Sequence, residues 1–352
     1  MRKSILCIVF ILLTLAMVAC SPVMPDVIKE ESPSPSASQE ATVTPSATAE
    51  PTPTVLELRQ IRLTLDSVSL QNNIIGNPSK KNICIYLPPS YYASDKAYPV
   101  VYYLHGHGEG VGGYMGSNDT RFDEAFESGA NEFIFVEVQG DLYYYVNSPV
   151  TGNWEDYIMD EVIPLIDDTY RTKKSSESRG ICGFSMGGFG SLNLALRHPD
   201  VFGAVYSMSP GLLTEDGMTE AMESWRRDRS FLTDYARAFS PDPDTELLGH
   251  IPKLDGSEED DIIVEQWEDG FGNVKEKLDA YLELGIPLRA IGLSYGTNDA
   301  YTWIPKRTQY FSDLLSENEI DHTLFVFEGR HEVPPKSAQE HIIPFFNENL
   351  VF

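Results

Sequence analysis

The chain has 352 residues and carries 53 acidic against 26 basic residues, a formal net charge of −27. A surface this negative repels nucleic-acid phosphates and anionic lipid headgroups, which excludes a nucleic-acid partner and a basic membrane-docking patch. Hydrophobic residues make up 42% of the chain, and four cysteines are too few to staple a chain of this length. We therefore expect a protein folded around an apolar core rather than a disulfide scaffold.

Residues 1–19 have the pattern of a secretory signal. Arg2 and Lys3 precede an apolar run over residues 5–19, which is shorter than the roughly 20 residues that a membrane-spanning helix needs. Residues 17–20 read Met-Val-Ala-Cys and resemble the lipobox of bacterial lipoproteins. The resemblance implies lipidation of Cys20 and attachment to the extracellular face of a bacterial cell membrane through this lipid anchor only. Ordinary secretion with cleavage nearby is the alternative.

Residues 20–54 are rich in proline, serine and threonine and contain few large apolar side chains. Such a segment buries too little surface to offset its ordering entropy, so it is predicted to be an extended tether behind Cys20. The remaining residues, 55–352, are predicted to form one folded domain.

Within residues 55–352, short apolar runs alternate with helical patterns. Several of the runs are continuous rather than alternating, which is typical of strands buried on both faces. The runs lie at residues 61–65, 83–87, 100–104, 133–138, 181–184, 204–208, 288–293 and 324–327. Helices are expected at residues 154–170, with a bend at Pro164, and at residues 303–315 and 338–346. This order predicts an α/β fold with a mostly parallel sheet covered by helices on both faces.

A G-x-S-x-G motif occupies residues 183–187, after a predicted strand and before a helix of small residues. A sharp strand-to-helix turn needs glycines beside the serine, because larger side chains collide across it. The turn presents the Ser185 hydroxyl at a helix N-terminus whose free N–H groups can stabilise an oxyanion. Residues 292–296 also match the motif, but a loop follows them instead of a helix. We therefore take Ser185 as the candidate nucleophile and Ser294 as a structural strand-end serine.

A nucleophilic serine needs a base, and the base needs an orienting acid. Among seven histidines, His331 directly follows the last predicted strand, while Asp299 follows the strand before it. The chain order serine, acid, histidine is that of the α/β-hydrolases. The sequence thus predicts a Ser185–His331–Asp299 triad, with a plain surface-loop aspartate as the alternative for Asp299.

Five segments together resemble the esterase D–like branch of the α/β-hydrolases, which includes S-formylglutathione hydrolases, feruloyl esterases, enterochelin esterases and mycolyltransferases. They are residues 85–91 (Ile-Tyr-Leu-Pro-Pro-Ser-Tyr), 98–106 (Tyr-Pro-Val-Val-Tyr-Tyr-Leu-His-Gly), 163–167 (Ile-Pro-Leu-Ile-Asp), 183–188 (Gly-Phe-Ser-Met-Gly-Gly) and 198–202 (His-Pro-Asp-Val-Phe). The resemblance runs through most of residues 60–350. It implies an α/β-hydrolase fold with an insertion before the penultimate strand.

The resemblance also implies roles for single residues. Ser185 matches the nucleophile, Asp299 the acid and His331 the base, and the oxyanion hole is expected from the backbone N–H groups of Met186 and His107. His105 and His107 have no third ligand at sensible spacing, so we expect neither a metal nor another cofactor. After the base, residues 333–335 read Val-Pro-Pro where a tryptophan-containing stretch is usual. This departure concerns the leaving-group side of the site and not the triad.

The substrate-binding surface is less defined by the sequence. Residues 212–270 form a loop-rich insertion with seventeen acidic and five basic residues; a solvated cap face is expected, and an acidic recognition surface is the alternative. Aromatic residues near the motifs are candidates for a flat platform that binds a sugar or a phenolic acyl group, with core packing as the alternative. They are Tyr145, Trp154, Tyr301 and Trp303, together with Tyr143, Tyr144 and Trp225.

Cys84 and Cys182 lie inside predicted strands that are not neighbours in the family's strand order, so both are expected to be buried free thiols.

The predicted function is that of a serine carboxylic-ester hydrolase working through an acyl-enzyme. Expected substrates are small-molecule esters or feruloyl or acetyl esters on a polysaccharide, or siderophore esters. An acyltransferase and a catalytically inactive surface-binding protein are the alternatives. The oligomeric state is left open.

Overall fold

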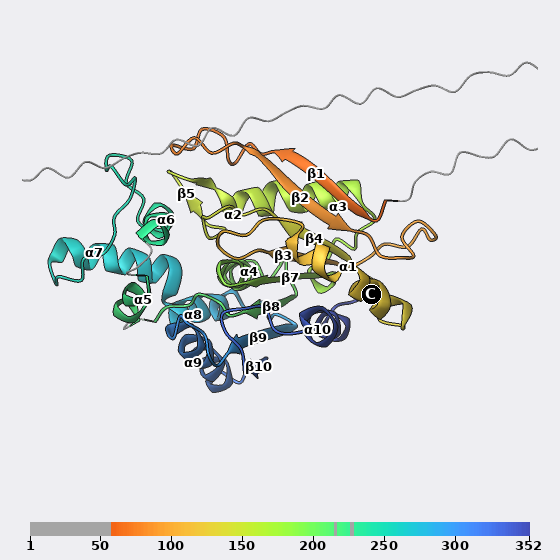
Figure 1. The fold of residues 1–352 in the computed structure, drawn as a ribbon. Helices are drawn as coiled ribbons and strands as arrows, with labels where there is room; N and C mark the ends of the chain where they lie inside the picture. Colours follow the sequence, from red (N-terminus) through yellow and green to blue (C-terminus); the bar gives the residue numbers. More distant parts are fainter. Residues whose placement is uncertain (1–57, 215–216, 226–228) are drawn as a thin grey trace, which may run out of the picture. The chain divides into compact units, whose positions relative to one another are not determined.

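Figure 1 shows the fold in a computed structural model that describes residues 58–214, 217–225 and 229–352. The predicted signal, the lipidation site Cys20 and the whole of the predicted tether lie outside these residues. Nearly all of the predicted domain, which began at residue 55, lies within them.

The fold is organised around one eight-stranded sheet. In spatial order its strands are β1 (Gln60–Asp66), β2 (Lys80–Tyr86), β4 (Ile134–Val138), β3 (Val100–Leu104), β7 (Arg179–Phe184), β8 (Ala204–Met208), β9 (Ala290–Gly296) and β10 (Thr323–Phe327). The strands β1 and β2 are antiparallel to their neighbours, and the other six run parallel. All eight predicted strands are present, and the mostly parallel α/β sheet is confirmed.

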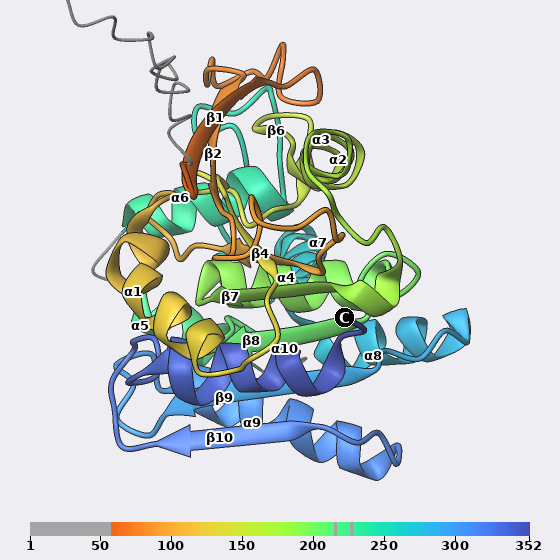
Figure 2. The same ribbon diagram turned by 90° about the vertical axis from the view of Figure 1, so that its right-hand side faces the viewer.

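Helices cover both faces of this sheet, as Figure 2 shows. They are α1 (Gly113–Glu127), α2 (Trp154–Asp156), α3 (Ile163–Thr169), α4 (Met186–Arg197), α5 (Met218–Ser224), α6 (Arg229–Phe239), α7 (Glu258–Trp267), α8 (Val274–Leu284), α9 (Trp303–Glu317) and α10 (Ile343–Asn349). Buried side chains of α1 and α10 share one apolar cluster, and those of α4, α8 and α9 share the other. The carboxyl ends of the parallel strands therefore meet along one edge between two helical layers.

Two of the predicted helices contain a wider turn directly before a proline. The helix over residues 154–169 has a π-helical turn at Tyr157–Val162, where the Ile163 N–H bonds the Ile158 carbonyl five residues back. The last helix repeats the arrangement at Ala338–Ile342, ahead of Pro344. Proline has no N–H to continue the α-helical pattern, and the π turn shifts the hydrogen-bond register before it. The bend expected at Pro164 thus takes the form of this wider turn.

The insertion between β8 and β9 is more helical than the sequence predicted. It contains α5, α6 and α7, which gather on the left in Figure 1, where a loop-rich segment was expected. These helices are short, so they depend on packing against the domain more than on a periodic pattern of their own.

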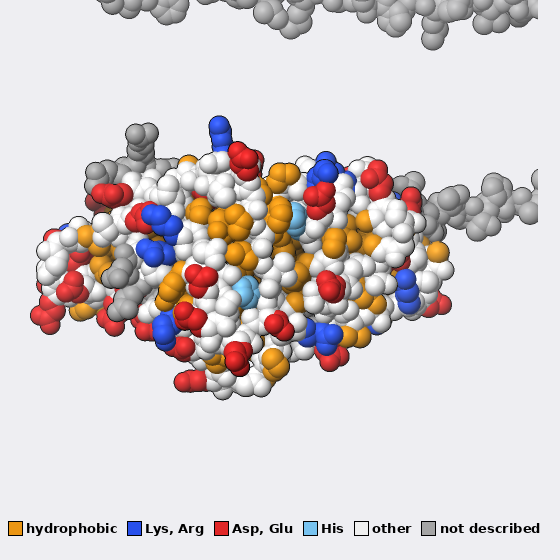
Figure 3. Space-filling view, turned by 90° about the horizontal axis from the view of Figure 1, so that it is seen from below, with side chains coloured by type: hydrophobic (Ala, Val, Ile, Leu, Met, Phe, Trp, Pro, Cys, Tyr) orange, Lys and Arg blue, Asp and Glu red, His pale blue; other side chains and the backbone are white. Residues whose placement is uncertain are grey.

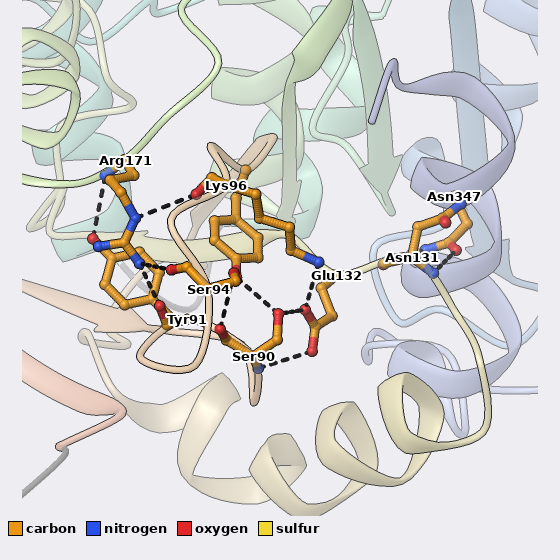
Figure 4. Close-up of polar contacts among 9 residues, drawn as sticks. Ser90, Tyr91, Ser94, Lys96, Asn131, Glu132, Arg171 and Asn347 are labelled. Carbon is orange, nitrogen blue, oxygen red and sulfur yellow. Dashed lines mark hydrogen bonds and ion pairs between the residues drawn. The ribbon is translucent and has the colours of Figure 1, made fainter.

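A network of hydrogen bonds and ion pairs stabilises the segments at the amino ends of the parallel strands (Figure 4). The Glu132 carboxylate accepts the backbone N–H of Ser90 at 3.0 Å and the Lys96 ammonium at 3.0 Å. The Arg171 guanidinium donates to the Ser94 carbonyl at 3.0 Å and packs 4.0 Å from the ring centre of Tyr91. These contacts fix the segment that leads into β3 and leave the opposite edge of the sheet for the G-x-S-x-G turn.

Cys84 lies on β2 and Cys182 on β7, with β4 and β3 between these strands, and both thiols are free as expected. Cys182 is buried, but Cys84 is only half-buried, which corrects the expectation that both would be buried. Burial raises the pKa of the Cys182 thiol well above its usual value. None of the helices in the described ranges is long and apolar enough to cross a bilayer.

Candidate active site

Ser185 occupies a sharp turn between β7 and α4. Its backbone has φ 55° and ψ −114°, a strained conformation for a residue with a side chain. A Cβ at Gly183 would lie 2.2 Å from the Gly187 carbonyl oxygen, and a Cβ at Gly187 would lie 1.9 Å from the Leu104 carbonyl oxygen. Both clashes are with backbone, so this turn requires the two glycines of the motif.

His331 joins Ser185 to Asp299 through its two ring nitrogens. The Ser185 hydroxyl lies 2.8 Å from Nε2, and the Asp299 carboxylate oxygen Oδ2 lies 2.7 Å from Nδ1. The Asp299 side chain is fully buried, and its other oxygen accepts the Tyr301 N–H at 2.8 Å. The structure therefore brings the three predicted residues into one hydrogen-bonded chain.

The loops that carry Asp299 and His331 are bonded to each other. The Thr297 N–H donates to the Phe327 carbonyl at 2.9 Å, and the Asn298 N–H donates to the Gly329 carbonyl at 2.8 Å. Gly296 permits this contact, because a Cβ there would lie 2.4 Å from the Arg330 carbonyl oxygen. The acid and the base are thus held in register by backbone contacts that continue the β9–β10 pairing.

The loop after β3 lies against the serine turn. His105 uses both ring nitrogens, since Nε2 accepts the Gly140 N–H at 3.0 Å and Nδ1 lies 2.8 Å from the Gly106 carbonyl oxygen. Burial lowers the pKa of this imidazole, so it stays neutral at pH 7. The Gly106 N–H donates to Glu109 Oε2 at 2.9 Å. These bonds shape the segment that ends in His107, one of the two residues expected to supply the oxyanion hole.

His107 connects this loop to the insertion. Its Nε2 lies 3.1 Å from the buried Asp234 carboxylate on α6, and its ring centre lies 4.2 Å from that of Phe231. Met186, the other residue expected at the oxyanion hole, is the first residue of α4. The two predicted residues thus come from separate elements, the loop after β3 and helix α4.

A small aromatic pocket opens at Ser185 and has a volume of about 20 Å³. Its walls are Tyr144, Trp225, Phe231, Tyr235, Tyr301 and Trp303, with Ile304 and His331. The insertion supplies Trp225, Phe231 and Tyr235, so it forms part of the pocket wall. Trp225 was among the aromatic candidates. Phe231 and Tyr235 were not predicted, because they lie in a segment without a motif.

Two of the predicted platform residues belong to the core instead. Tyr145 is fully buried, and its hydroxyl donates to the His105 carbonyl at 2.9 Å. Trp154 is fully buried, and its indole N–H donates to the Thr151 carbonyl at 3.1 Å. Neither side chain lines the pocket at Ser185. Tyr143 does not line it either. The predicted platform is corrected to Tyr144, Trp225, Tyr301 and Trp303, which do.

The serine of the second motif does not line the pocket at Ser185. Ser294 is fully buried within β9, between Met208 of β8 and Phe325 of β10. Among the residues that the structure describes, no group of three or more histidine, cysteine or acidic side chains is arranged to hold a metal.

Comparison with known proteins relates this arrangement to esterases. The protein-family model for esterases ("Esterase") matches residues 77–247, just under half of the chain. Over these residues the chain is similar to the esterase D–like family of α/β-hydrolases that its motifs resemble. One relative is Esterase MT1326 of Mycobacterium tuberculosis, 30% identical over 157 residues that cover 42% of this chain and 32% of that protein. Another is an endo-1,4-beta-xylanase/feruloyl esterase of Xylanibacter ruminicola, 32% identical over 34% of this chain and 18% of that protein. The chain therefore matches a third or less of the length of these relatives.

Solved structures share the whole fold of this domain. A ferulic acid esterase superposes with a TM-score of 0.59 at 24% identity, over 83% of this chain and 98% of that one. An S-formylglutathione hydrolase from Agrobacterium tumefaciens superposes with a TM-score of 0.56 at 17% identity, over 83% and 95%. These similarities confirm the predicted α/β-hydrolase fold.

Proposed function

We propose that this protein is a serine carboxylic-ester hydrolase that works through an acyl-enzyme on Ser185. The observation that carries the proposal is the Ser185–His331–Asp299 chain, with separations of 2.8 and 2.7 Å. A serine hydroxyl at this distance from an imidazole can lose its proton as it attacks, and a buried carboxylate stabilises the imidazolium that forms.

The first half of the proposed reaction acylates the serine. Ser185 Oγ attacks the carbonyl carbon of the ester while its proton moves to Nε2 of His331. The carbonyl oxygen becomes an oxyanion, for which the N–H groups of Met186 and His107 are the proposed donors. The tetrahedral intermediate then expels the alcohol, which leaves with the proton from Nε2.

The second half releases the acid. A water molecule gives a proton to Nε2 of His331 and attacks the acyl carbon, and a second oxyanion forms in the same place. Its collapse breaks the bond to Ser185 Oγ, which takes the proton back from Nε2. An alcohol that replaces water at this step yields a transferred ester, which is the acyltransferase alternative.

The acyl part of the substrate is proposed to be short. The aromatic pocket at Ser185 is narrow, with a volume of about 20 Å³ between aromatic side chains. A short acyl group suits so small a pocket better than the extended ring system of a feruloyl group. Among the expected acyl groups, the pocket favours acetyl.

The test uses two 4-nitrophenyl esters that share one leaving group, the acetate and the ferulate. We expect kcat/KM for the acetate to exceed that for the ferulate by at least tenfold. Ser185→Ala should remove nearly all turnover, because no acyl-enzyme forms without the hydroxyl. Ser294→Ala is the matched control and should keep most activity. A dead Ser294 variant beside an active Ser185 variant would refute the nucleophile, and a preferred ferulate would refute only the acyl assignment.

We also propose that the domain is held at the extracellular face of a bacterial membrane through lipidated Cys20. The lipobox resemblance at residues 17–20 and the composition of residues 20–54 support this location. The substrate would then be an ester outside the cell, free or attached to a polysaccharide.

A further inference from the structure

A second cavity, of about 460 Å³, lies beside the loop that carries His331. Three segments line it: the loop after β3, helix α1, and the loop after the base. The lining residues used below are Glu109 from the first segment, Asn118 and Arg121 from the second, and Val333, Lys336 and Ser337 from the third. This cavity is more than ten times larger than the aromatic pocket, and the two share no lining residue.

The large cavity is within reach of an ester bound at Ser185. Val333 follows His331 by two residues, so their Cα atoms lie within about 7 Å of each other. On the other side, Glu109 accepts the N–H of Gly106, the residue before His107. An ester has two parts, and only the smaller fits the aromatic pocket. The cavity therefore suits the alcohol part.

Arg121 provides the guanidinium group of the large cavity. Its half-buried guanidinium lines the cavity and donates through Nη1 to the Asn118 amide oxygen at 3.1 Å. Within the described part of the chain it has no carboxylate partner, whereas Arg59 binds Asp123 of the same helix at 2.5 and 2.8 Å. Acidic side chains are spread over the face of the molecule in Figure 3. A guanidinium left without one of them keeps its planar donor edge for a ligand.

The other charges of the cavity do not neutralise Arg121. Lys336 is paired with Glu340 at 2.8 Å on the exposed rim. Glu109 belongs to the loop before α1, and Arg121 lies eight residues beyond the first residue of α1, which is about 12 Å along the helix axis. Among the described residues, Glu109 bonds the Gly106 N–H and Arg121 bonds Asn118, and no ion pair joins the two side chains.

The remaining polar groups of the cavity can form hydrogen bonds with the hydroxyl groups of a ligand. The Asn118 side chain, 6% exposed, donates to the Tyr114 carbonyl and accepts from Arg121. The Tyr114 and Ser337 hydroxyls bond each other at 2.9 Å. One wall therefore combines a free guanidinium with side-chain hydroxyls and an amide, groups that bind a carboxylate and sugar hydroxyls respectively.

Building on the esterase activity proposed above, we propose that this cavity is the alcohol subsite and that Arg121 binds a carboxylate on the alcohol. The substrate class is then acetyl esters of acidic carbohydrates such as uronates. The negative field of the whole protein disfavours anions at long range, so recognition depends on the local contact with Arg121.

Three acetylated sugars test this proposal: an O-acetyl methyl glucuronoside, its uncharged methyl ester, and the matching O-acetyl methyl glucoside. We expect the wild-type kcat/KM for the acid to exceed that for its methyl ester by about tenfold, as one charge-assisted hydrogen-bonded pair provides. In Arg121→Gln the ratio should fall to about one, mainly through KM. Arg62→Gln, an arginine outside this cavity, is the matched control and should keep the wild-type ratio. A wild-type ratio near one, or an unchanged ratio in Arg121→Gln, would overturn the subsite.

Binding measured without turnover separates this proposal from the esterase activity. Calorimetry on the Ser185→Ala protein should show tighter binding of methyl glucuronoside than of methyl glucoside, and Arg121→Gln should remove the difference. If 4-nitrophenyl acetate is not hydrolysed but this difference is present, the proposed function fails and the subsite stands. If the acetate is hydrolysed and the two sugars bind alike, the subsite fails alone.

Discussion

At the scale of single residues, the site depends on which ring nitrogen of His331 carries the proton. Nδ1 faces the Asp299 carboxylate, which only accepts, so Nδ1 carries the hydrogen and Nε2 is left to accept from Ser185. The second carboxylate oxygen of Asp299 accepts the Tyr301 N–H. Asp299 therefore fixes the tautomer of His331, while the Tyr301 N–H fixes Asp299.

Asp299→Asn should reverse the tautomer of His331. The Tyr301 N–H would hold the amide oxygen of Asn, which turns the amide NH₂ toward Nδ1 and forces the hydrogen onto Nε2. A protonated Nε2 cannot accept the Ser185 proton, so kcat for 4-nitrophenyl acetate should fall by up to about 10⁴-fold. Unfolding curves of both proteins serve as the control for structure. A loss below tenfold in a folded variant would contradict the role given to Asp299.

The triad residues could be predicted from sequence because each follows a buried strand in a fixed order. Ser185 directly follows β7, and Asp299 and His331 lie in the loops after β9 and β10, and strand order alone brings such positions to one edge. Aromatic residues carry no comparable rule. Tyr145 and Trp154 lie near the motifs in the chain, but their side chains enter the core, which no spacing reveals. The pairing of His107 with Asp234 joins residues 127 positions apart and equally lacked a signal.

At the scale of elements, the serine turn between β7 and α4 limits which substitutions its glycines tolerate. Gly187→Ala would place a methyl group 1.9 Å from the Leu104 carbonyl oxygen, which is fixed in the β3 backbone. We expect a loss of about 2–4 kcal/mol in the free energy of unfolding, measured in urea. Gly116→Ala is the control, because the new Cβ meets nothing within 4 Å near the start of α1. That variant should be neutral or up to about 1 kcal/mol more stable.

The contact between α8 and α4 gives a pH-dependent prediction. Lys277 on α8 donates to the Asn193 amide oxygen on α4 at 3.0 Å, and burial lowers its pKa from 10.5 to about 8. Between pH 8 and pH 10.5 the unfolded chain keeps a proton that the folded protein has lost, so this residue makes stability rise with pH in that window. Below pH 8 both states are protonated and the burial penalty is constant.

Comparing wild type with Lys277→Met isolates this effect. The difference in unfolding free energy should move in favour of wild type by about 1.4 kcal/mol per pH unit, up to about 3 kcal/mol, between pH 8 and pH 10.5. Lys275→Met, at an exposed position on the same helix, should show no such rise. A flat difference for Lys277→Met would mean that the ammonium stays solvated in the folded protein.

The elements themselves were predicted unequally, for physical reasons. All eight sheet strands were found because each is a short apolar run, and the helices at residues 154–170, 303–315 and 338–346 were found from their apolar faces. The insertion helices α5, α6 and α7 were missed. They are seven, eleven and ten residues long, and helices this short are stabilised by tertiary packing that the sequence does not display.

At the scale of the whole molecule, the predicted anchor and tether are expected to determine the location of the domain without changing its esterase activity. Cys20→Ala should move the protein from the membrane fraction to the soluble fraction, because no acyl chain is attached. Deleting residues 25–50 should leave kcat/KM for 4-nitrophenyl acetate unchanged, since a segment of this composition buries too little surface to pack on the domain. Both are measured by fractionation and by initial rates on the same preparations. Membrane association that survives Cys20→Ala would refute the lipid anchor, and turnover that depends on residues 25–50 would mean that this segment packs against the active site.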